Sequence, residues 1–208
     1  KKDFHHLQEV INQGMPVVLF DRISNDIMCD KVIIDDQLAA YEATNFLISK
    51  GLKKIALLTT VDYVSVGKLR TDGYLDVLHD HGIEVEENLI IRIEDTEHCD
   101  EKINELLENQ SIDAILAVNE LFAVTAIKLA MSKGIKIPED LSVVAFTDGI
   151  ISKYSTPTIT TISQNGIKMG RKAAEMLINR LELEDEDDEH YRTEIIETNL
   201  IIRESTKS

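Results

Sequence analysis

The feature that most constrains the fold is residues 134–149, which read Gly-Ile-Lys-Ile-Pro-Glu-Asp-Leu-Ser-Val-Val-Ala-Phe-Thr-Asp-Gly. The leading glycine follows an amphipathic run and stands where a left-handed residue commonly ends a helix. After a proline that turns the chain, Leu141 to Phe146 form a largely apolar run, which is typical of a strand covered on both faces. We therefore expect Thr147 and Asp148 to lie at the carboxyl end of a buried strand, where open α/β sheets bind their ligands.

Similar runs recur along the chain and alternate with amphipathic segments. Further strands are expected at residues 17–20, 32–34, 55–58, 89–93 and 114–118. This alternation favours an α/β fold in which parallel strands are joined by crossover helices. Residues 150–156 are expected to form a loop, and the acidic run 182–189 a solvated loop. The last strand, residues 194–202, alternates more than the others and is expected near a sheet edge or bridging two lobes.

Composition excludes several classes of protein. No apolar run among the 208 residues approaches the ~20 that a membrane helix needs, so we expect no membrane association. A formal net charge of −16 would repel a phosphate backbone, so any contact with DNA must come from another region. Cys29 and Cys99 are isolated thiols, which favours a reducing, cytoplasmic location over a disulfide scaffold.

Polar residues stand directly after several of the apolar runs. They are Asp21, Asp35, Thr59, Asn119, Thr147 and Asp148. Parallel strands would gather several of these side chains along one rim, where they could bind a small molecule. The alternative is that each one caps the helix that follows it, which is the usual role of such residues at a strand-to-helix turn. Spacing alone does not decide between the two.

Arg70 is expected on the inner face of a helix, because it shares a helical stripe with Tyr74 and Val77. A buried guanidinium needs acceptors to offset its desolvation. One hypothesis is an internal ion pair with Asp148 or Asp21. The other is that Arg70 donates hydrogen bonds to a bound small molecule.

Sequence signatures of catalysis are absent. The chain has no glycine-rich phosphate loop, no nucleophile elbow and no histidine in a recognisable catalytic spacing. The histidines fall on polar faces or in loops. We therefore expect no enzymatic activity, no cofactor and no metal site.

A set of motifs in a fixed order carries a resemblance to a known family. They are Phe20-Asp21-Arg22, Arg70 with Gly73-Tyr74, Asp113-Ala114-Ile115, Val118-Asn119-Glu120, Gly134 to Phe146, Pro157 to Gln164, Gly170 with Ala173-Ala174, and Ile202 to Thr206. Together they resemble the effector-binding region of the lactose/galactose-repressor (LacI/GalR) family of bacterial transcription regulators, over nearly the whole chain.

The resemblance implies two Rossmann-like lobes of the periplasmic-binding-protein type, with parallel sheets and helices on both faces. It assigns residues 1–35 and 163–193 to the first lobe, and residues 36–162 and 194–208 to the second. It also implies a helix-turn-helix headpiece and further strands of the first lobe upstream of Lys1. The first lobe is therefore expected to be incomplete by roughly 60 to 80 residues.

The resemblance also implies a ligand site between the lobes. Residues matching Asp21, Arg70 and Asn119 line the effector site in the family, and so does a loop residue matched by Glu94 or Asp95. The family usually has an acidic residue at the position of Thr147, whereas here the carboxylate is one place later, at Asp148. The effector is expected to be a sugar or another small metabolite.

The mechanism that the resemblance implies is a population shift. The effector binds one closure state better and so changes the operator affinity of a homodimer. Ile150, Ile151, Tyr154 and the helix that starts at Leu121 are the expected dimer contact. Two other functions remain open. An extracytoplasmic solute-binding protein would carry a signal peptide upstream, and an α/β enzyme would turn over its ligand.

Overall fold

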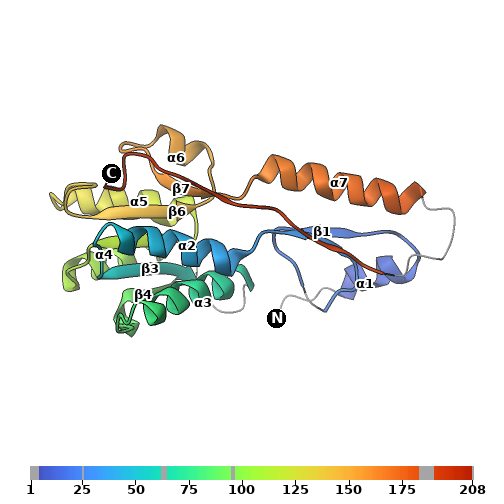
Figure 1. Cartoon of the computed structure of the whole chain (residues 1–208), viewed down its shortest axis with the longest axis horizontal. Coiled ribbons are helices and arrows are strands. Elements are labelled where there is room, and N and C mark those ends of the chain that lie inside the picture. Colours follow the sequence, from blue (N-terminus) through green and yellow to red (C-terminus); the bar gives the residue numbers. More distant parts are fainter. Residues whose placement is uncertain (1–4, 25, 62–64, 95–96, 183–189, 208) are drawn as a thin grey trace. The chain divides into compact units, whose positions relative to one another are not determined.

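The computed structural model describes residues 5–24, 26–61, 65–94, 97–182 and 190–207. The chain divides into two compact units (Figure 1). Unit 1 comprises residues 1–35 and 164–198, and unit 2 comprises residues 36–163 and 199–208. The chain therefore passes from one unit to the other at residues 35/36, 163/164 and 198/199. The sequence had suggested residues 163–193 for the first lobe. The structure moves its end to Thr198, because residues 193–195 pair with a strand of unit 1.

Unit 1 contains a parallel three-stranded sheet in the order β1-β2-β8. Its elements are α1 (His5–Asn12), β1 (Val18–Phe20), β2 (Asp30–Ile33), α7 (Gly166–Glu182) and β8 (Thr193–Ile195). Helix α7 packs on β1 and β2. Its stripe of Met169, Ala173 and Met176 is buried, as expected for an amphipathic helix lying against a sheet. Helix α1 contributes no buried residue.

A buried ion pair ties α7 to the start of β2. Arg180 donates from Nε to Asp30 Oδ2 at 2.7 Å, and the backbone N–H of Arg192 donates to Asp30 Oδ1 at 2.7 Å. Burial acts to raise the pKa of Asp30, but the hydrogen bonds and charge of Arg180 and Arg192 outweigh it, so the pKa is lowered. The carboxylate therefore stays ionised and holds the segment after α7 against the sheet.

Unit 2 contains a six-stranded sheet in the order β4-β3-β5-β6-β7-β9. The strands are β3 (Ile55–Thr60), β4 (Ile90–Ile93), β5 (Ala114–Ala117), β6 (Ser142–Phe146), β7 (Thr160–Ser163) and β9 (Asn199–Ile201). All neighbours are parallel except β7 and β9. Strands β5 and β6 are buried at every position, which explains why their sequences are apolar without alternation.

Helices cover both faces of this sheet. They are α2 (Asp36–Ser49), α3 (Ser65–Asp80), α4 (Cys99–Asn109), α5 (Glu120–Ser132) and the short α6 (Ile150–Tyr154); a 3-10 turn, η1 (Glu87–Leu89), precedes β4. Helices α2 and α3 pack on each other, and so do α4 and α5. The α/β class with parallel sheets is confirmed. None of the helices in the described residues has the length and apolar character of a membrane span.

Two local predictions were wrong, and one lies outside the described residues. Residues 150–154 form helix α6 rather than a loop, because Glu120 of α5 accepts hydrogen bonds from its first turn. The last predicted strand is two strands, β8 and β9, one in each sheet. Each lies at an edge of its sheet, in agreement with the expected edge position. Residues 183–189 of the acidic run lie outside the described residues.

Candidate functional site

The carboxyl ends of adjacent strands bring several predicted residues of unit 2 to one edge of the sheet. Strands β3, β5 and β6 are parallel neighbours, so Asn119 and Thr147, which come after β5 and β6, lie on the same side as Thr60, the last residue of β3. The predicted Thr59 is buried within β3. Glu94 follows β4, the next strand along, and is exposed. Parallel strands produce this arrangement whatever the sequence of their loops. We call these strand ends, with the residues that support them, the carboxyl edge.

Arg70 lies beneath the carboxyl edge and is 4% exposed. Its Nε and Nη2 both lie 2.7 Å from Asp36 Oδ1, and its Nη1 donates to the Val118 carbonyl at 2.6 Å. Its guanidinium carbon lies 3.7 Å from the centroid of the Phe146 ring. The inward direction of Arg70 was predicted, but the partner was not Asp148 or Asp21. Asp36 is the partner because it begins α2, the helix that packs against α3.

The contacts of Arg70 support the two strand ends that carry polar groups. Val118 immediately precedes Asn119, and Phe146 immediately precedes Thr147. One buried side chain therefore contacts the residue before each of them, through the backbone carbonyl of Val118 and the ring of Phe146. Asp36 was missed as a site residue because the sequence placed it only after a strand and gave no sign that it faces α3.

Asn119 is the N-cap of α5, and its Oδ1 accepts from the Phe122 N–H at 2.8 Å. The capping role that the sequence left open is thus present. Its amide nitrogen makes no hydrogen bond within the described part of the chain, and the side chain is half-buried. Asn119 can therefore cap the helix through its oxygen and donate to a ligand through its nitrogen.

Thr147 adopts a left-handed conformation with φ of 77°. This region is unfavourable for a β-branched residue, so the surrounding structure must hold it there. Part of the restraint comes from its own N–H, which donates to the Ile162 carbonyl at 3.0 Å. The residue is exposed and directly follows the buried strand β6. Backbone strain of this kind concentrates at functional sites, and the ligand-binding role of Thr147 stays a prediction.

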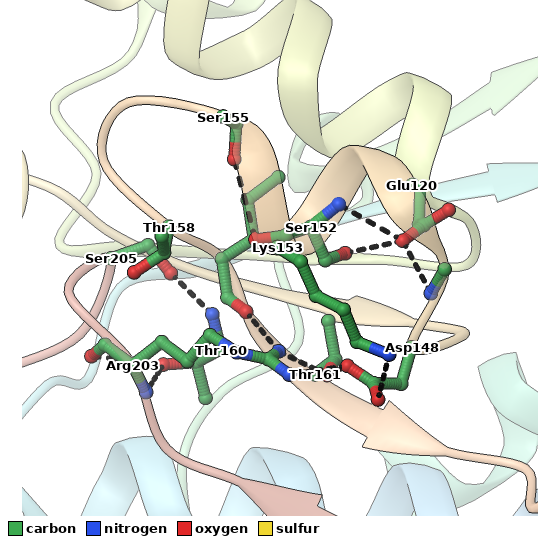
Figure 2. A network of polar contacts seen from close by, with 12 residues as sticks. Glu120, Asp148, Ser152, Lys153, Ser155, Thr158, Thr160, Thr161, Arg203 and Ser205 are labelled. Atoms are coloured by element: carbon green, nitrogen blue, oxygen red, sulfur yellow. Dashed lines mark hydrogen bonds and ion pairs between the residues drawn. The ribbon is translucent and has the colours of Figure 1, made fainter.

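Asp148 belongs to a polar network that ties β7 to the end of the chain (Figure 2). Its Oδ1 accepts hydrogen bonds from Arg203 Nη2 and from the Thr161 hydroxyl, and Lys153 Nζ lies 3.2 Å from Oδ2. Burial acts to raise the pKa of Asp148, but hydrogen bonds from Arg203 and Lys153 outweigh it and the pKa is lowered. The carboxylate is thus an internal anchor of unit 2.

The same network contains two residues that were not predicted as functional. Glu120 Oε1 accepts from the N–H of Gly149 at 2.7 Å and from the Ser152 hydroxyl at 2.6 Å, which fixes the start of α6. Arg203 donates to the Ile159 carbonyl at 2.8 Å and to the Thr161 hydroxyl at 2.9 Å (Figure 2). The family motifs at 118–120 and 202–206 were the signal for these contacts.

Asp21 belongs to unit 1, where it follows β1. It has a φ of 62°, and its Oδ1 accepts from Gln164 Nε2 at 3.3 Å. Its backbone N–H donates to the Val32 carbonyl at 3.1 Å. Asp21 is therefore held by two segments of unit 1 that are distant in sequence. Asp95, the alternative to Glu94, lies outside the described residues.

The carboxyl edge also contains a hydroxyl without a hydrogen bond. Thr60 Oγ1 is buried and has no partner among the described residues. A Cβ added at Gly67 would lie 2.2 Å from this oxygen, so the Thr60 side chain would have to shift to admit it. The described residues contain no group of three His, Cys, Asp or Glu side chains placed to hold a metal ion.

Comparison with known proteins identifies a family match over most of the chain. The periplasmic binding protein-like domain family matches residues 44–206. The transcriptional regulator DegA of Bacillus subtilis is 31% identical over 165 residues, which cover 79% of this chain and 49% of DegA. This chain spans about half the length of the curated relatives that it matches.

Solved structures of transcription regulators have the same fold as this chain. The transcriptional regulator CelR in complex with cellobiose has a TM-score of 0.86 and 28% identity, covering 96% of this chain and 61% of CelR. A regulatory protein of the LacI family from Chloroflexus aggregans has a TM-score of 0.83 and 28% identity, covering 97% of this chain and 72% of that protein. These proteins share the fold over nearly all of the present chain.

Proposed function

Because this chain belongs to the periplasmic binding protein-like domain family, we propose that it is the small-molecule-sensing region of a bacterial DNA-binding transcription regulator. Its relatives are regulators of the LacI family, which confirms the resemblance seen in the sequence and favours this function over a solute-binding protein or an enzyme. We place the sensor in the cytoplasm. DNA would be bound by a headpiece outside this sequence, since the chain carries a net charge of −16.

The observation that carries this proposal is the grouping of polar side chains at the carboxyl edge. In our proposal the ligand contacts Asn119, Thr147 and Glu94 at the carboxyl edge of unit 2. Asp21 of unit 1 stays a separate prediction as a ligand residue. Arg70 and Asp148 complete the site by holding its strand ends. Binding would shift the protein between two conformations of different operator affinity, and no covalent bond is made or broken. The CelR complex indicates that this fold accommodates a sugar, and a sugar or similar metabolite is our candidate effector.

Substitution of Asn119 by serine tests the ligand site. Serine still caps α5 through its hydroxyl, but it lacks the amide nitrogen that we assign to the ligand. We expect the full-length protein to retain a small molecule that native mass spectrometry detects, and we expect the variant to bind that molecule roughly tenfold more weakly. The control is Asn104→Ser in α4, which removes an exposed amide bonded to Glu108. Equal binding by both variants would contradict the assignment of Asn119.

We also propose a homodimer formed through α5 and α6. These helices pack on each other (Figure 1). They present Ile150, Tyr154 and Leu121 with exposures of 73%, 82% and 42%. Ile151 and Met131 extend this surface with exposures of 38% and 48%. Large apolar side chains gathered on a surface are typical of an interface, and a symmetric dimer of this kind buries roughly 1,200 Å² or more.

Substitution of Ile150 by glutamate tests the dimer. A charge at the centre of an apolar interface should raise the dimer dissociation constant about thirtyfold in sedimentation velocity experiments. Ile167→Glu is a matched control, because Ile167 lies on α7 of unit 1 and has a similar exposure of 77%. Dissociation by the control to the same extent, or no effect of Ile150→Glu, would exclude this surface.

A further inference from the structure

The buried pair formed by Arg70 and Asp36 determines what charge a ligand at the carboxyl edge can have. Building on the proposed small-molecule site, we propose that Asp36 is a specificity-determining residue that makes this site select uncharged ligands over anions. Asp36 acts through Arg70 and is therefore a positioning residue.

The Asp36 carboxylate neutralises the positive charge of Arg70. Their side chains are 5% and 6% exposed, so their interaction is little screened by water. Two nitrogens of the guanidinium lie 2.7 Å from one carboxylate oxygen, and a third donates to the Val118 carbonyl. A cation that would otherwise attract anions is thereby neutralised where it lies beneath Asn119 and Thr147.

The other charges of unit 2 at this edge do not replace that cation. Arg203 and Lys153 both contact the Asp148 carboxylate. Glu120 accepts hydrogen bonds from α6, and Glu94 is an exposed acid. Arg203 and Lys153 are thus both paired with Asp148, and Glu94 adds exposed negative charge at this edge. A carboxylate or phosphate on the ligand would therefore lose hydration without gaining a cation.

Substitution of Asp36 by asparagine tests the effect of the Asp36 charge separately from its hydrogen bonds. The amide oxygen of asparagine can still accept from Arg70, so the contact is preserved while the negative charge is removed. The guanidinium then becomes a net positive charge beneath the site. Asp35→Asn is the matched control, because it removes the same charge from the adjacent, exposed residue. Asp36→Glu keeps the charge and is the conservative variant.

The experiment measures binding of matched pairs of sugars by the full-length protein and its three variants, using calorimetry. The pairs are glucose and glucuronate, ribose and ribose 5-phosphate, and cellobiose and cellobionate. We expect the wild-type protein, Asp35→Asn and Asp36→Glu to prefer the uncharged member of any pair they bind. In Asp36→Asn, the ratio of the two affinities should shift toward the anion by about tenfold. General destabilisation would weaken both members equally and leave this ratio unchanged.

The results that would contradict the role of Asp36 differ from those that would contradict the sensing function. Equal or tighter binding of the anion by the wild-type protein, or an unchanged ratio in Asp36→Asn, would overturn the role of Asp36. The same ratio shift in Asp35→Asn would show that net charge, and not the buried pair, is responsible. Failure of all six compounds to bind any variant, together with an operator affinity that none of them alters, would instead contradict the proposed sensing function for this class of ligand.

Discussion

Replacing Arg70 with methionine is expected to lower the free energy of unfolding of unit 2 by about 3–5 kcal/mol. Methionine retains apolar bulk beside Phe146 but removes the group that neutralises Asp36, whose side chain is 6% exposed. It also removes the donor to the Val118 carbonyl. Loss of one member of a buried ion pair costs far more than loss of a surface pair, because the remaining charge stays desolvated.

Lys68→Met is the matched control for this prediction. Lys68 lies on the same helix and pairs with Asp72, but its side chain is 63% exposed. Water and salt screen such a pair, so we expect a change within about 0.5 kcal/mol. Urea unfolding followed by far-UV circular dichroism measures both variants, since the chain has no tryptophan. If Arg70→Met lowers the free energy of unfolding no more than Lys68→Met does, the structural role of the buried pair is refuted.

Replacing Gly73 with alanine is expected to destabilise unit 2 by about 3 kcal/mol, the upper end of the range for overpacking. A Cβ at this position would lie 2.0 Å from the Gln37 carbonyl oxygen and 3.0 Å from the Tyr41 nitrogen. Both atoms belong to the backbone of α2, so no side-chain rotation relieves the clash. Helices α2 and α3 would have to separate, which would also disturb the contact between Asp36 and Arg70.

For Gly170→Ala we expect the opposite effect on stability. Gly170 lies in α7, and a Cβ there would meet no atom within 4 Å. Alanine favours the helix and restricts the unfolded chain, so we expect a gain of about 0.5–1 kcal/mol. The two variants are compared by thermal unfolding. Similar effects of the two substitutions, whatever their sign, would rule out close helix packing as the reason for the glycine at position 73.

The sequence predicted those features that depend on periodicity. Strand β6 could be located because a largely apolar segment ends abruptly at Thr147, and α3 because Arg70, Tyr74 and Val77 share one face. Since neighbouring parallel strands end at a common edge, Asn119 and Thr147 could also be placed on the same side of the sheet. The structure agrees in each case: Tyr74 and Val77 are buried, and β5 and β6 are adjacent.

Features that depend on contacts between distant residues could not be predicted. Helix α6 forms because Glu120, far away in sequence, accepts hydrogen bonds from its first turn. Arg70 pairs with Asp36, and Asp148 with Arg203, although sequence spacing gives no preference between such partners. The last segment was expected as one strand, and its division into β8 and β9 follows from pairing with two different sheets. Local propensity does not encode any of these pairings.

Hydrogen exchange of the full-length protein, with and without the small molecule that it retains, tests whether the carboxyl edge binds the ligand. We predict that the ligand slows exchange at residues 118–120 and 146–149, where the carboxyl edge presents Asn119 and Thr147. Residues 166–182 of α7, which belong to unit 1 and carry none of the proposed ligand contacts, should change little. Protection confined to α7, with residues 118–120 and 146–149 unaffected by the ligand, would contradict a sensor built on this edge.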